Sequence, residues 1–163
     1  MNQTIYLLDA NVIIELVKSL APIIDGLDRK ITEIIAEGRM ISVYEVFQEL
    51  TAQGQDDAAA RWAKRHRAIF HHPEREEAEK LKEILARASE KAGYTKPYNA
   101  DPWLIAFAQS QPLSRQGHLF RGTDYAVVAL DGGVKALADK FRITCLTWKD
   151  VFRKEGWSPK IGK

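Results

Sequence analysis

The sequence contains one cysteine, Cys145, among its 163 residues. A single cysteine excludes an internal disulfide and a cysteine-based zinc site, and we expect it to lie in an apolar core strand. The N-terminus has no basic segment followed by a long apolar core, and no apolar run approaches the ~20 residues of a membrane span. We therefore expect a protein of the reducing cytoplasm that does not associate with membranes.

The charges nearly balance, with 24 Lys and Arg against 22 Asp and Glu and a net charge of +2. So small an excess cannot make the whole surface attract nucleic acid, so any polyanion site must be local. The best local basic patch comprises Arg61, Lys64, Arg65, His66 and Arg67. Its simplest interpretation is a solvated helix face; the alternative is a contact of Lys64 and Arg65 with the phosphate backbone of a substrate.

Short apolar runs alternate with segments of helical spacing, and no internal repeat or linker divides the chain. We predict strands at 4–8, 39–43, 125–130 and 143–147, and helices at 12–20, 23–37, 45–53, 56–68, 73–93, 102–109 and 134–141. Asn11 is the expected N-cap of the first helix. The alternation predicts a single α/β domain over 1–163, with a parallel sheet covered by helices on both faces.

Four acidic residues occupy positions that a parallel sheet would bring together. Asp9 and Asp131 follow predicted strands, Glu49 lies in the helix after the second strand, and Asp101 stands at a helix start. The carboxyl ends of parallel strands and the adjoining helix starts form the ligand crevice of such sheets. We expect all four carboxylates to reach that edge.

Such a cluster needs a positive partner, because two carboxylates about 4 Å apart repel by about 4 kcal/mol at an effective dielectric of 20. Oxygen ligands without His or Cys favour Mg²⁺ or Mn²⁺ over zinc. These ions activate water and stabilise the charge of a phosphoryl transition state. The acidic residues therefore predict a Mg²⁺ or Mn²⁺ site for phosphoryl chemistry.

Several blocks of the sequence occur in a familiar order: YLLDANVIIEL, VFQEL, ADPWLIAFA, YAVVALD and ITCLT. In that order they resemble the PIN-domain ribonucleases, over residues 4 to about 152. The similarity is greatest to the bacterial PIN-like group with an Asp-Pro-Trp third block, related to the VapC-type toxins of toxin-antitoxin pairs.

This resemblance implies a PIN-like three-layer α/β/α fold with a short parallel central sheet. It implies a Mg²⁺- or Mn²⁺-dependent endoribonuclease, acting on RNA and paired with a cognate antitoxin protein. Asp9, Glu49, Asp101 and Asp131 match the acidic metal-binding and catalytic quartet, and Asn11 matches a polar residue two places after the first aspartate. Whether Asp131 or Glu45, one helical turn from Glu49, completes the site stays open, as does a homodimeric state.

Two other functions stay open. The family often has Thr or Ser two residues before its fourth acid, where this chain has Ala129. Because of that departure, the protein could also be a non-catalytic PIN-like module that binds RNA or protein. A phosphatase or phospho-acceptor domain using Asp9 as nucleophile would want a second Asp at position 11, where this chain has Asn11.

Two remaining features are expected to be structural. His71 and His72 have no partner at metal-ligand spacing and should be surface or packing residues. The polar segment 111–124 carries Arg115, His118 and Arg121. We expect it to lie at the opposite edge of the sheet, as a mobile loop or a surface that binds a partner.

Overall fold

A computed structural model describes residues 3–52, 57–88, 100–114, 123–130 and 132–158. At its centre is a five-stranded sheet in the order β3-β2-β1-β4-β5. Its strands are β1 (Gln3–Leu8), β2 (Met40–Val43), β3 (Phe70–His71), β4 (Thr123–Val128) and β5 (Thr144–Leu146). Every pairing is parallel, so the carboxyl ends of all the strands face one edge.

The central strands are buried on both faces, which explains their continuously apolar sequence. In β1, Tyr6, Leu7 and Leu8 are inaccessible to solvent, as are Val127 and Val128 of β4. These two strands pair along their whole length. The predicted α/β class with a short parallel sheet is confirmed.

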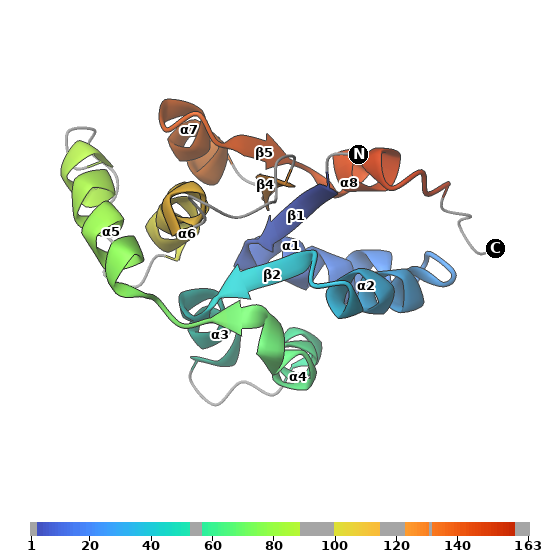
Figure 1. The fold of residues 1–163 in the computed structure, drawn as a ribbon. Coiled ribbons are helices and arrows are strands. Elements are labelled where there is room, and N and C mark those ends of the chain that lie inside the picture. The colour runs from blue at the N-terminus through green and yellow to red at the C-terminus, as the bar shows by residue number, and fades with distance from the viewer. Residues whose placement is uncertain (1–2, 53–56, 89–99, 115–122, 131, 159–163) are drawn as a thin grey trace.

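Helices cover both faces of this sheet. The helical elements are α1 (Ala10–Glu15), η1 (Leu16–Leu20), α2 (Leu27–Ala36), α3 (Tyr44–Thr51), α4 (Ala58–Arg65), η3 (Arg67–Ile69), α5 (Arg75–Ala88), α6 (Asp101–Ser114), α7 (Gly132–Lys140) and α8 (Trp148–Lys154). Figure 1 shows α5, α6 and α7 gathered on one side of the sheet, with α1, α2 and α8 on the other. No helix in the described ranges is long and apolar enough to cross a lipid bilayer.

The first two helices begin at other residues than predicted. Asp9, not Asn11, is the N-cap of α1, because its side chain accepts from the amide of Ala10; Asn11 lies inside the helix. The second helix begins at Leu27 rather than residue 23, since Gly26 precedes it in the left-handed conformation with φ of 75°. Glycine adopts that conformation without steric cost.

Three further predictions need correction. No strand was predicted between the helices at 56–68 and 73–93, but Phe70 and His71 form the edge strand β3 by pairing with β2. Helix α8 was not predicted at all. In the segment 111–124, residues 111–114 continue α6 and residues 123–124 begin β4, whereas Arg115, His118 and Arg121 lie outside the described residues.

Candidate functional site

Asp9 lies at the carboxyl end of the central strand, between β1 and α1. Its side chain is only 2% exposed. The Oδ1 atom accepts a hydrogen bond of 2.7 Å from the Ala10 amide, and the Asp9 amide donates to the Val128 carbonyl at 3.1 Å. Strand pairing and helix capping therefore fix Asp9 at the point where β1 and β4 both end.

Glu49 lies on α3, the helix that follows β2. Its Oε1 accepts a hydrogen bond of 2.8 Å from the amide of Ala100, which directly precedes α6. Burial raises the pKa of Glu49, the Ala100 amide opposes that rise, and the nearby charge of Asp101 adds to it. Glu49 and Asp101 are therefore close enough for their charges to interact.

The sheet topology explains why Asp9, Glu49 and Asp101, far apart in the sequence, lie at the same edge of the sheet. Strands β2 and β4 flank β1, so α1 and α3 both start at the carboxyl edge. Because α6 leads into β4 and a helix before a parallel strand runs in the opposite direction, the first residue of α6, Asp101, also lies at this edge. The Ser42 hydroxyl of β2 donates a hydrogen bond of 2.6 Å to the carbonyl of Leu8, the last residue of β1. This bond joins the two strands near the carboxyl edge.

The carboxylates at this edge have the oxygen atoms that a hard divalent cation prefers as ligands. Asp9, Glu49 and Asp101 offer only oxygen, and a cation would offset the repulsion that helps to raise the pKa of Glu49. Within the parts of the chain that are described, no three His, Cys, Asp or Glu side chains are arranged as a metal site. Asp131, the fourth predicted acid, lies outside the described residues.

Glu45 is the residue that the sequence left open as an alternative to Asp131. It lies one turn before Glu49 on α3, and among the described residues its buried Oε2 has no hydrogen-bond partner. Burial raises the pKa of Glu45, and the charge of His72 opposes the rise.

The two histidines make the packing contacts expected of them. The ring centroids of His72 and Tyr44 are 4.2 Å apart, and those of His71 and Phe107 are 5.8 Å apart.

The basic patch falls on α4 and the turn after it. Arg61, Lys64 and Arg65 are exposed, whereas Trp62 of the same helix is buried. His66 packs against Trp62 with ring centroids 4.5 Å apart, and Arg67 lies over the ring of Phe47 at 5.5 Å. The patch is thus part solvated and part packed, since Arg61, Lys64, Arg65 and Arg67 are exposed and His66 is half-buried.

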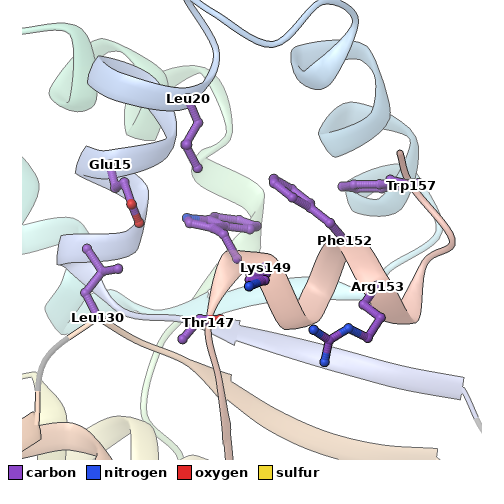
Figure 2. Close-up of a pocket in the computed structure, with 9 residues that line it drawn as sticks. Glu15, Leu20, Leu130, Thr147, Lys149, Phe152, Arg153 and Trp157 are labelled. Atoms are coloured by element: carbon purple, nitrogen blue, oxygen red, sulfur yellow. The ribbon is translucent and has the colours of Figure 1, made fainter. Parts of the chain in front are cut away.

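A pocket between α1 and α8 was not predicted from the sequence. It has a volume of about 490 Å³ and is lined by Glu15, Leu20, Leu130, Thr147, Trp148, Lys149, Phe152, Arg153 and Trp157 (Figure 2). Most of these residues belong to α8 or its flanks. The signal that could have revealed α8 is the capping box formed by Thr147 and Asp150.

Comparison with known structures defines the class of fold. The chain is similar to a chain of VapBC2 from Rickettsia felis, in a crystal structure bound to a DNA fragment from their promoter. The TM-score is 0.55 at 11% sequence identity, covering 88% of this chain and 98% of that chain. At this identity the likeness concerns the fold alone, which is the PIN-like, VapC-type fold that the resemblance implied.

The sequence also matches a family model described as "Domain of unknown function (DUF4411)" over residues 6–159. The protein belongs to this family. No curated protein matches the sequence.

Proposed function

We propose that this protein is an endoribonuclease that hydrolyses RNA phosphodiester bonds with Mg²⁺ or Mn²⁺. The observation that carries the proposal is the contact between α3 and the start of α6, which holds Glu49 beside Asp101 at the same sheet edge as Asp9. The VapC-type fold supports the proposal, because parallel sheets of open α/β folds bind ligands at the carboxyl edge of their strands.

In this mechanism the metal would be held by Asp9, Glu49 and Asp101, with Asp131 as the fourth acid and Glu45 as its alternative. The bound ion supplies activation of water and neutralises charge that develops on the phosphate. Backbone amides fix the first two carboxylates: Ala10 orients Asp9, and Ala100 orients Glu49. One such bond leaves acceptor capacity on a carboxylate, which has about four lone-pair sites.

The same chain supplies contacts for the rest of the substrate. Asn11 is exposed on the first turn of α1, two residues from Asp9, where it can reach a phosphate or sugar beside the cleaved bond. Lys64 and Arg65 on α4 would hold the phosphate backbone further away. No serine or cysteine nucleophile is needed in this scheme, because the ion would supply the activation of water.

The PIN-like fold without catalysis is the second candidate function. Ala129 favours it, because it follows β4 with no hydroxyl where the resembled family often has one, and its side chain is buried in the core. In that case the protein would bind RNA or a protein partner and its carboxylates would not support hydrolysis.

We also propose a cognate antitoxin as protein partner, in the cytoplasm. The support is the likeness in fold to a component of VapBC2. The proposed function is also compatible with a homodimer of this protein.

Cleavage of end-labelled RNAs tests the function directly. Purified protein is incubated with single-stranded and structured RNAs in Mn²⁺, Mg²⁺ or EDTA, beside Asp9→Asn and the control Asp139→Asn on the exposed face of α7. We expect metal-dependent cleavage by the wild type and the control, and none by Asp9→Asn. RNA binding without cleavage would favour the second candidate, and equal cleavage by Asp9→Asn would contradict the assignment of Asp9.

A further inference from the structure

We infer that the pocket beside α8 binds one unstacked RNA base, and that guanine fits it best. This inference rests on the proposed function in taking RNA as the ligand. It concerns a site outside the acidic cluster, built from α1, the chain after β4, and α8 with the residues that follow it. Its volume of about 490 Å³ lies within the range of roughly 300–1,000 Å³ typical of small-ligand sites.

The wall of the pocket is aromatic. Trp148 is 3% exposed, and its indole Nε1 donates to the Val12 carbonyl at 2.9 Å, which fixes the ring against α1. Phe152 lies 6.1 Å from Trp148 and 5.5 Å from Trp157 between ring centroids, so the three rings form a row. Trp148 and Phe152 are buried and support Trp157, whose ring is only half-buried and can stack a nucleic-acid base, because every base has a flat π-face.

Two cations stand at the rim of this wall. Lys149 and Arg153 are exposed and lie one turn apart, on the same side of α8 (Figure 2). Arg153 forms a long ion pair with Asp150, at 4.0 Å, and the Arg153 side chain is 72% exposed. Such an exposed pair is weak, so Arg153 is available to a phosphate. A base against the rings would place its phosphate near these two side chains.

Glu15 supplies the polar group that selects the base. Among the described residues its buried Oε2 has no hydrogen-bond partner, and Figure 2 shows the carboxylate directed from α1 into the space between Leu130 and α8. The last torsion of a glutamate is soft, so rotation can present either oxygen to a ligand. A ligand that donates to this carboxylate would satisfy an acceptor whose burial is otherwise costly.

Guanine is the base with the right donors. Its Watson–Crick edge has two adjacent donors, N1–H and N2–H₂, which match the two oxygens of a carboxylate. On the same edge the other three bases place an acceptor beside each donor, and a carboxylate repels that acceptor. Base edges of unstacked nucleotides are what sequence-specific RNA-binding proteins commonly recognise.

The pocket is also close to the acidic edge. Glu15 follows Asp9 by six residues on one helix, a rise of about 9 Å, and Leu130 directly precedes Asp131 in the sequence. A base held in the pocket would therefore belong to a nucleotide near the bond that is cut. The pocket would set where the RNA is cleaved.

The test uses mononucleotides, which separates this inference from the proposed function. GMP, AMP, CMP and UMP are titrated into the full-length protein in EDTA, and quenching of tryptophan fluorescence is followed, since Trp148 and Trp157 line the pocket. We expect GMP to bind most tightly. Glu15→Gln should lower the affinity for GMP roughly tenfold, whereas Glu33→Gln on the exposed face of α2 should leave it unchanged.

A second variant tests the rim without touching buried atoms. Lys149→Ala with Arg153→Ala should weaken all four nucleotides by a similar factor. Equal affinity for the four nucleotides, or no effect of either variant, would overturn the inference. Guanine selectivity without metal-dependent cleavage of RNA would refute the nuclease alone, whereas cleavage at positions that Glu15→Gln does not alter would refute the pocket alone.

Discussion

Glu49 and Ala100 are 51 positions apart in the sequence and are joined by a hydrogen bond of 2.8 Å from the Ala100 amide to the Glu49 carboxylate. The bond fastens α3 to the start of α6, and it leaves Glu49 next to the charge of Asp101. One side chain thus has two roles, since it orders a helix start and adds a negative charge to the acidic edge.

Substitutions at Glu49 should separate these two roles. Glu49→Ala leaves the buried Ala100 amide without its acceptor and should lower the free energy of unfolding by about 1–3 kcal/mol. Glu49→Gln keeps an acceptor oxygen and should be nearly neutral in EDTA, while losing RNA cleavage. Urea unfolding of both variants measures this, and equal destabilisation by Gln and Ala would show that the charge itself is structural.

The dependence of stability on pH should also report on Glu49. Because burial and Asp101 raise its pKa, the folded state binds its proton more tightly than the unfolded state does. The free energy of unfolding should therefore fall as pH rises through the folded pKa, above the ordinary value of 4.5. In EDTA, Glu49→Gln should lack this fall, so its stability relative to the wild type should increase with pH. A constant difference between the two proteins would contradict the raised pKa.

Glu155 should behave in the opposite sense. It forms a bidentate pair with Arg39 at 2.8 and 2.9 Å, and it accepts from the Tyr6 hydroxyl, with Arg39 and Glu155 only 13% and 15% exposed. The bond to Arg39 is the main cause that lowers the pKa of Glu155. Its contribution to stability is present above the unfolded pKa and is lost as pH falls through the folded pKa.

Glu155→Gln should therefore cost about 2–4 kcal/mol at neutral pH. The difference from the wild type should shrink in acid, as the wild-type carboxylate takes up its proton. Chemical unfolding at pH 7 and near pH 3 measures both values, with Glu33→Gln as an exposed control. A cost that stays the same at both pH values would show that packing, not charge, holds α8 in place.

The α4 patch should contact phosphates rather than bases. Lys64 and Arg65 are exposed and the aromatic ring of their helix, Trp62, is buried, so α4 has no exposed ring on which a base could stack. Replacing both residues by Ala should weaken RNA binding about equally for all sequences and lower the salt slope by roughly two, one for each contact. An unchanged slope in filter binding at several salt concentrations would place the RNA elsewhere.

The predictable parts of this molecule are those with a strong local signal. The apolar runs of β1 and β4 have no alternative to burial between helices, and their carboxyl ends placed Asp9 correctly. The short edge strand β3 was missed because two residues, Phe70 and His71, show no alternation, and only pairing with β2 defines them. The start of α2 was misplaced because Ile23 and Ile24 continue the helical spacing, whereas the backbone turns at Gly26.

The positions of Asp9, Glu49 and Asp101 at a strand end or on a helix were predictable, whereas the contacts of their side chains were not. Spacing placed Glu49 on a helix after β2, but its bond to Ala100 depends on tertiary packing that no local pattern shows. The α8 pocket escaped for the same reason, because Glu15 and Trp148 are brought together only by the sheet order.

The proposed function depends most on a divalent cation at the acidic edge. Thermal unfolding of the wild type and Asp101→Asn, each in EDTA and in excess Mn²⁺, tests for this cation most directly. Without metal the carboxylates repel, so Asp101→Asn should be as stable as the wild type or more stable. Mn²⁺ at 100 times its dissociation constant should stabilise the wild type by about 2.7 kcal/mol and the variant far less. A variant that is destabilised in EDTA and gains as much from Mn²⁺ as the wild type would contradict the claim.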